Sequence, residues 1–279
     1  MEGYYTVKEV VEKYIQGCQA KVQMPLKSLV VKAVMAGAMI AMGAGISSVA
    51  AHTVPDVGLA RLAAAVVFPV GLMMVILLGA ELFTGDCLVA MSVFDKKQKI
   101  SSCIKLLFWV YLGNFLGAAM IALFIALSGQ LDYSAGMLGA YTIKVAVGKV
   151  NISFVQGIIS GVLCNILVFA AVLMAMCAKD ITGKLLASFF VIMLFVTGGF
   201  EHCVANMYYI TAGLIAMNNP EYVDLTISAY GFSQEYVESL NVINFLVKNL
   251  LPVTIGNILG GAFFVGAPLY YLNHNKTKS

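Results

Sequence analysis

Charged side chains are scarce in this chain of 279 residues. They make up 11% of the sequence, whereas a soluble globular protein carries about 25%. Hydrophobic residues reach 61%, and they gather in uncharged runs comparable to the roughly 20 residues that a membrane-spanning helix needs. The composition excludes a soluble domain, gives no support to nucleic-acid binding, and predicts a membrane protein.

Motifs for cross-linking, metal binding and export are also missing. The six cysteines show no CxxC or ligand spacing, so we interpret them as small packing residues rather than a disulfide framework. No HExxH motif is present, and we expect no metal and no other cofactor. The first residues lack the basic region, apolar core and cleavage site of a secretory signal, so none is expected.

Six apolar stretches are predicted to cross the bilayer, which makes the chain an all-α membrane protein. They cover residues 33–51, 62–94, 106–131, 154–178, 185–217 and 249–272. Charged residues interrupt the second and the fifth, so each is predicted to be a broken helix. The segment at 132–153 is expected to be a polar, glycine-containing connection, and the segment at 218–248 a long acidic loop. The chain divides into an amphipathic N-terminal cytoplasmic helix (1–27), a six-span domain (28–272) and a cytoplasmic tail (273–279).

The N-terminal segment has the pattern of an amphipathic helix. Thr6 and Glu9 form a capping-box signature, and apolar residues then recur at helical spacing. We expect this helix to lie at the membrane interface or to pack against the membrane domain. In the first span a small residue occupies every fourth position from Ala33 to Gly45, which favours close approach of another helix.

The distribution of basic residues predicts the orientation. An even number of spans puts both termini on one side, and 13 of the 17 Lys and Arg residues then share that side. The positive-inside rule therefore predicts cytoplasmic termini in an inner membrane. Arg61, Lys144, Lys149 and Lys248 lie on the other side. There Lys149 either draws anions toward a pore mouth or is an ordinary solvated lysine.

Short sequences recur in the two halves of the chain. GNFLG at residues 113–117 is echoed by GNILG at 256–260, and GAE at 79–81 by GFE at 199–201. Because each half holds three spans, the second copy must be inverted in the membrane. Inverted repeats with broken helices in matching positions indicate a transport site near the midplane.

Four ionisable residues fall inside the predicted spans: Glu81, Asp86, Glu201 and His202. Such residues are costly in a bilayer unless they face a cavity or find partners. For the two glutamates we favour a supporting role, in which the carboxylates accept hydrogen bonds from backbone N–H groups freed at the breaks. Asp86 is interpreted as a cap of the following half-helix or as a residue near the cytoplasmic water.

His202 is the main candidate for transport chemistry. A neutral imidazole passes a proton at physiological pH, whereas an imidazolium attracts an anion. The alternative is a buried histidine that Asn165, Asn206 or Thr84 satisfies. The hydroxyl of Thr84, followed by a flexible glycine, either bonds a permeating ion or the histidine ring, or bonds only its own helix.

Three stretches resemble the signature of the formate/nitrite transporter family. They are LFTG at residues 82–85, GVLCN at 161–165 and GFEHCVANM at 199–207, and the likeness extends from about residue 27 to 271. The resemblance implies an aquaporin-like fold of six spanning helices, built from two inverted repeats. It also implies a homopentamer with one pore per protomer, which passes small monovalent anions of weak acids.

The resemblance assigns site residues as well. The family's central histidine falls on His202, its loop threonine on Thr84 and its outer lysine on Lys149, and we expect Asn165 and Asn206 on the same pathway. The implied hydrophobic constrictions are Phe68, Leu72, Leu82, Val168 and Phe195. The residues expected to support the helix breaks are Glu81, Glu201, Gly85 and Gly199.

We therefore expect a pH-sensitive channel or transporter for anions such as formate, nitrite or hydrosulfide, not an enzyme, with those anions, protons and the lipid bilayer as partners. Lys149 would attract the anion, low dielectric would favour its protonation, and His202 would donate the proton or supply a transient positive field. The motifs leave open which anion is carried and whether a proton accompanies it.

Two alternatives remain. A pore for neutral solutes such as water or ammonia is disfavoured because paired Asn-Pro-Ala turns and a second intramembrane histidine are absent. A membrane-embedded hydrolase using Glu201 and His202 would need a serine at an active-site turn or a set of metal ligands, and neither is visible.

Overall fold

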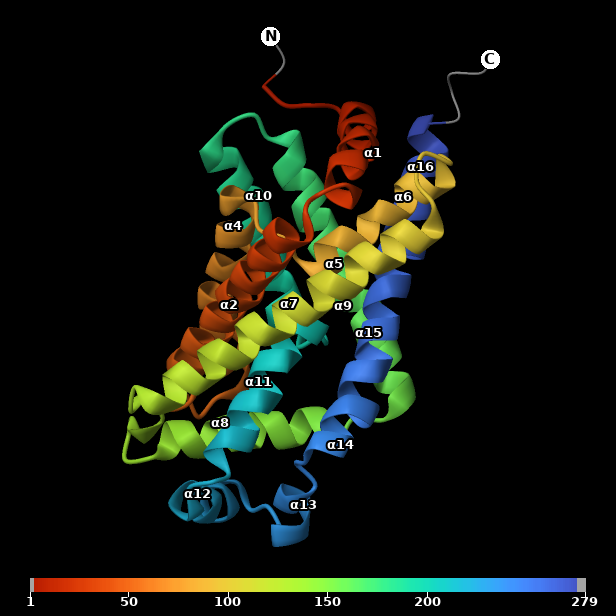
Figure 1. Cartoon of the computed structure of the whole chain (residues 1–279). Helices are drawn as coiled ribbons and strands as arrows, with labels where there is room; N and C mark the ends of the chain where they lie inside the picture. The colour runs from red at the N-terminus through yellow and green to blue at the C-terminus, as the bar shows by residue number, and fades with distance from the viewer. Residues whose placement is uncertain (1–2, 275–279) are drawn as a thin grey trace.

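The computed structural model describes residues 3–274, and the regular elements in that range are helical, with one isolated bridge between Tyr4 and Ala178. Figure 1 shows a bundle of long helices with α1 and the end of α16 at one end and α8, α12 and α13 at the other. The predicted tail at 273–279 lies outside the described residues from position 275 on.

Six helical segments of the described chain are long and apolar enough to cross a membrane. They are α2 (Leu26–Ala51), α3 and α4 together (Val57–Val67 and Pro69–Leu78), α7 (Ile100–Leu127), α9 (Phe154–Cys177), α10 (Ile181–Gly198) and a last run made of α14 (Val242–Asn244), η3 (Phe245–Leu250), α15 (Leu251–Ile258), η4 (Leu259–Gly266) and α16 (Ala267–His274). Their number agrees with the prediction. α2 and α7 begin earlier than predicted, because lysines near their ends are tolerated within the helix.

Helical structure is interrupted after α4 and after α10. The elements that follow are α5 (Phe83–Asp86), η1 (Cys87–Val89) and α6 (Ala90–Phe94) in the first case, and α11 (Cys203–Ala216) in the second. Each interruption starts at a left-handed glycine, Gly79 with φ 64° and Gly199 with φ 68°, a conformation that glycine adopts without strain. Gly85 was predicted to support the first break, but it lies inside α5 and has no positive φ. Gly79 has that role instead.

Both polar segments, the predicted connection at 132–153 and the predicted loop at 218–248, contain helices. These are η2 (Gln130–Asp132), α8 (Met137–Val150), α12 (Pro220–Tyr230) and α13 (Gln234–Glu238). α8 lies across the end of the bundle in Figure 1. The side chain of Asn219 accepts the Glu221 N–H at the start of α12, and Gly231, with φ 65°, follows its end. The loop prediction for 218–248 was wrong, because it followed the polar composition of the segment and did not use these capping signals.

The small-residue face of α2 packs closely on α7. A Cβ atom on Gly37 would lie 2.0 Å from the carbonyl oxygen of Asn114, and one on Gly117 would lie 2.0 Å from that of Val34. Ala33 is fully buried in the same contact region. The predicted close helix packing is confirmed, and Figure 1 shows the two helices crossing.

α1 (Val7–Val22) packs its apolar face against the membrane-spanning helices. The predicted capping box is present, because the Thr6 side chain accepts the Glu9 N–H and the Glu9 carboxylate accepts the Thr6 N–H. Val10, Val11 and Cys18 are buried, and α1 contacts α6, α7, α9 and α16. Of the two predicted placements, the structure therefore has α1 packed on the domain.

We expect Cys18 to resist alkylation in the native protein. Burial raises the pKa of its thiol to about 11, and the residue is 1% exposed. Because the thiolate is the reactive form, N-ethylmaleimide at pH 8 is expected to modify Cys18 at least about tenfold more slowly than Cys177, which is partly exposed. Peptide mass spectrometry measures both rates, with denatured protein as the control. Equal rates in the native protein would contradict the docking of α1.

Candidate functional site

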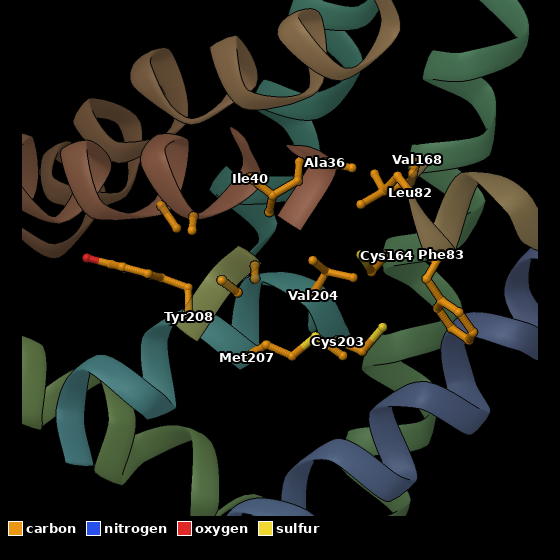
Figure 2. Close-up of a cluster of buried hydrophobic side chains, with 14 of the residues drawn as sticks. Ala36, Ile40, Leu82, Phe83, Cys164, Val168, Cys203, Val204, Met207 and Tyr208 are labelled. Atoms are coloured by element: carbon orange, nitrogen blue, oxygen red, sulfur yellow. The ribbon is translucent and has the colours of Figure 1, made fainter. Parts of the chain in front are cut away.

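The five residues predicted to form hydrophobic constrictions meet at one place. Together with His202 they line a cavity of about 10 Å³, here called the central chamber: Phe68, Leu72, Leu82, Val168 and Phe195. The Phe68 and Phe195 rings pack edge to face with centroids 5.6 Å apart, and Figure 2 shows Leu82 beside Val168. The chamber has room for about one water-sized molecule.

A larger cavity adjoins the central chamber on each side. On the α8 side, the outer vestibule of about 260 Å³ shares Phe68, Phe195 and His202 with the chamber. On the α1 side, the inner vestibule of about 380 Å³ shares Leu72 and Leu82. The three spaces therefore adjoin one another in series, and apolar side chains separate the chamber from each vestibule.

His202 lies at the start of α11, and its hydrogen bonds identify its neutral form. The backbone N–H of Ala205 donates to Nδ1 over 3.1 Å, so Nδ1 carries no proton. The ring proton is therefore on Nε2, which donates to the Thr84 hydroxyl oxygen over 2.9 Å. A second proton on Nδ1 would break this cap and place a cation at a helix N-terminus, which is unfavourable. The local structure favours imidazole over imidazolium.

Of the three partners predicted for His202, Thr84 is the one that contacts the imidazole in the described structure. The Asn165 amide donates to two backbone carbonyls instead, and the Asn206 amide donates to Glu201 Oε2 over 2.6 Å. Asn206 lines the outer vestibule. Thr84 and Asn165 are fully buried and line neither vestibule nor the chamber. Both residues contact the site through hydrogen bonds, Thr84 to the His202 ring and Asn165 to backbone carbonyls.

Lys149 is paired rather than freely solvated. Its Nζ lies 3.0 Å from Glu201 Oε1, and its side chain is 16% exposed. Lys149 lines the outer vestibule, so the ion pair stands at the wall of that cavity. Because the carboxylate offsets the ammonium at close range, the pair projects a much weaker net field into the vestibule than an unpaired lysine would.

A second group of ion pairs stands beside the inner vestibule and joins α1 to the first interruption. Lys21 Nζ lies 2.5 Å from both Glu81 Oε2 and Asp86 Oδ1. Burial alone would lower the pKa of Lys21, but Asp86, Tyr14 and Glu81 together outweigh burial and raise that pKa well above its usual range. Lys21 could not be predicted as a site residue from local sequence pattern, because its partners lie 60 and 65 residues away along the chain.

Asn257 fixes the interruption that precedes α11. Its Oδ1 accepts the backbone N–H of Cys203 over 2.9 Å. Its Nδ2 donates to the carbonyl oxygens of Glu201, over 3.0 Å, and Gly161, over 2.8 Å. One amide side chain therefore satisfies three buried backbone groups at the break.

Asn114 makes a corresponding set of three hydrogen bonds at the other interruption. Its Oδ1 accepts the Phe83 N–H over 2.9 Å, and its Nδ2 donates to the carbonyl oxygens of Glu81, over 3.0 Å, and Ala33, over 2.7 Å. Both asparagines belong to the repeated Gly-Asn sequences. The repeat was noticed in the sequence, but the asparagines were not selected as site residues.

The acidic residues at the breaks bind side chains in the described structure. The carboxylates of Glu81 and Glu201 bind lysines and amides instead of freed backbone N–H groups. Asp86 pairs with Lys21 rather than capping the following half-helix. A carboxylate in an apolar site is better stabilised by a nearby ammonium than by a neutral donor, and the sequence did not reveal that lysines come close.

Comparison with known proteins was made by sequence. The model of the formate/nitrite transporter family matches residues 8–271. The formate channel FocA of Haemophilus influenzae is 38% identical over 217 residues, which are 77% of this chain and 75% of that protein. FocA of Escherichia coli K12 is 33% identical over 222 residues, 78% and 76% of the two chains. The uncharacterized transporter YrhG of Bacillus subtilis is 35% identical over 274 residues, 97% and 94%.

Two solved structures are also similar. A pentameric formate channel with formate bound matches with a TM-score of 0.78 and 31% identity, over 88% of this chain and 97% of that one. An ion channel of the same family matches with a TM-score of 0.80 over 95% and 98% of the two chains. At 24% identity, this second match supports the fold alone.

Proposed function

The chain belongs to the formate/nitrite transporter family, a family of channels and transporters rather than enzymes, and from this premise we propose that it is a channel for small monovalent anions of the formate class. One structural observation supports the proposal independently of family membership. Two vestibules, each with charged side chains in its lining, flank an apolar chamber that contains one neutral histidine. Such a passage opposes bare ions and admits small neutral molecules.

In the proposed mechanism the anion is protonated before it enters the central chamber. The apolar side chains there cannot replace the hydrogen bonds that the anion makes with water. The charged form therefore meets a high free-energy barrier, and the neutral acid meets a lower barrier. The neutral ring of His202 has one proton, on Nε2, and losing it would leave an unstable imidazolate. The proton therefore comes from hydronium ions in the water of the vestibule, which become water as the neutral acid forms, while His202, oriented by Thr84, offers a polar contact within the chamber.

The proposal extends to the architecture and the assembly. The matching hydrogen bonds of Asn114 and Asn257 support two inverted three-helix repeats with broken second and fifth helices. The face of α10 that exposes Leu186, Phe190 and Leu194 supports contact with lipid or with neighbouring protomers of a homopentamer. The common location of α1 and the end of α16 supports cytoplasmic termini in an inner membrane.

Formate uptake into proteoliposomes tests the function. Initial uptake is expected to rise about tenfold for each unit by which the external pH falls. At pH values well above the pKa of the acid, the undissociated form is a small fraction of the total, and that fraction increases about tenfold per pH unit. In His202→Asn, uptake is expected to fall about tenfold, a loss of about 1.4 kcal/mol. The pH slope is expected to persist, because the substrate rather than the histidine titrates.

The controls separate the two parts of this prediction. Empty liposomes define the leak, and uptake by the parent protein no faster than that leak would overturn the channel proposal. A flat pH profile in His202→Asn would assign the titration to the histidine and reject the protonation step proposed above. If His202→Asn shows the same uptake and the same pH slope as the parent, His202 has no role in the mechanism.

A further inference from the structure

A third cavity adjoins the outer vestibule and shares lining residues with it. This cavity, here called the outer basin, has a volume of about 710 Å³ and lies among the start of α3, α8 and the end of α12. Arg61 and Tyr141 line both the basin and the outer vestibule. The two spaces therefore meet at Arg61, and a solute in the basin reaches the vestibule past its guanidinium group.

The lining of both spaces is basic. Neither includes an aspartate or a glutamate, whereas the inner vestibule includes Glu81 and Asp86 beside its lysines. In the described part of the chain, no carboxylate lies within 4.0 Å of Arg61 or Lys144. Because Glu201 neutralises Lys149 at close range, the positive field of the vestibule comes mainly from Arg61.

The position of Arg61 suits contact with a passing anion. A Cβ atom built on Gly199 would lie 3.0 Å from Arg61 Nη1, so the guanidinium lies against the interruption that leads to His202. The planar fork of five N–H donors is well matched to a carboxylate. The side chain is exposed, so a ligand does not have to displace a buried partner.

Lys144 provides the second cation of the basin. Its Nζ lies 4.4 Å from the ring centroid of Tyr230 and 5.4 Å from that of Tyr141. The Tyr230 hydroxyl is buried and has no hydrogen-bond partner, which leaves a donor in the same wall. His52 also lines the basin, but its two ring nitrogens are already bonded to the Val49 carbonyl and the Ser134 hydroxyl.

We propose that Arg61 and Lys144 form an anion-binding site in the outer basin, separate from the central chamber, which takes up a small monovalent carboxylate and passes it to the outer vestibule. This inference rests on the proposed channel function. A capture site of this kind raises the local anion concentration at the pore mouth, and its effect weakens as salt screens the two cations. It contributes to entry and leaves the passage through the chamber unchanged.

Concentration dependence of formate uptake at low and high salt tests the site. In Arg61→Gln the concentration for half-maximal uptake is expected to rise roughly three- to tenfold at low ionic strength, while maximal uptake stays within about twofold. Lys144→Gln is also expected to raise the concentration for half-maximal uptake. Both variants should lose most of the salt dependence that the parent shows, whereas Arg61→Lys should retain it.

Lys248→Gln is the matched control. Lys248 is exposed, belongs to the same predicted outer side, and lines neither the basin nor the vestibule, so the same loss of charge there is expected to change nothing. If the parent conducts formate and Arg61→Gln and Lys144→Gln keep its half-maximal concentration and salt dependence, the capture site is rejected and the channel function stands. A fall in maximal uptake alone would show a structural role and would also reject the site. Absence of uptake in the parent would instead reject the channel function.

Discussion

The Asn257→Leu variant is expected to lose about 90% or more of the formate flux and to melt roughly 5–10 °C below the parent protein. Leucine has a similar size but no polar atoms. It would leave the Cys203 N–H and the carbonyls of Glu201 and Gly161 without the partner that Asn257 provides. Each buried group left unpaired costs about 1–3 kcal/mol. Since 1.4 kcal/mol changes a population about tenfold, the arrangement that places His202 in the chamber would become a minor state.

Proteoliposome uptake and a thermal melt in detergent measure these two effects. Asn218→Leu is the control, because Asn218 is exposed and donates only within its own turn. Asn114→Leu should reproduce the loss, since Asn114 makes the equivalent bonds at the other interruption. If Asn257→Leu conducts and melts like the parent, these bonds do not hold the break in place.

The sequence predicted the parts of this arrangement that local pattern encodes. The number of spanning segments followed from uncharged runs, and the α2 and α7 contact followed from the small residues between Ala33 and Gly45. The repeated Gly-Asn sequences contain Asn114 and Asn257, which make matching hydrogen bonds at the two interruptions. What the pattern did not contain was the bonding partner of each side chain, because an asparagine in an apolar helix has several backbone groups within reach.

The contacts that could not be predicted from the sequence are mainly those between segments far apart in the chain. Lys21 pairs with Glu81 across 60 residues of sequence, and Arg61 reaches the backbone of Gly199 from another helix. A linear pattern contains neither distance. The sequence therefore predicts backbone hydrogen-bond partners for the two glutamates, and it uses Arg61 only as one of the basic residues that indicate membrane orientation. The constriction residues were named through family resemblance, and packing around one small chamber explains why residues so far apart in sequence belong together.

The Gly117→Ala variant is expected to fold poorly or to melt more than about 10 °C below the parent, and to conduct no formate. Its methyl group would lie 2.0 Å from the Val34 carbonyl oxygen and 2.7 Å from the Ala38 nitrogen. These are backbone atoms of α2 that cannot rotate away, so the two helices must separate. Separation would also pull Asn114 from the Ala33 carbonyl, 2.7 Å away, and disturb the first interruption.

Gly148→Ala is the matched control for this prediction. A Cβ atom on Gly148, which lies in α8, has nothing within 4 Å, so alanine there is expected to leave stability unchanged or to raise it by about 0.5–1 kcal/mol through its better helix propensity. Size-exclusion profiles and thermal melts of both variants give the comparison. A Gly117→Ala protein that elutes, melts and conducts like the parent would mean that α2 and α7 do not need backbone contact. The position of Asn114 would then have to be fixed by its hydrogen bonds alone.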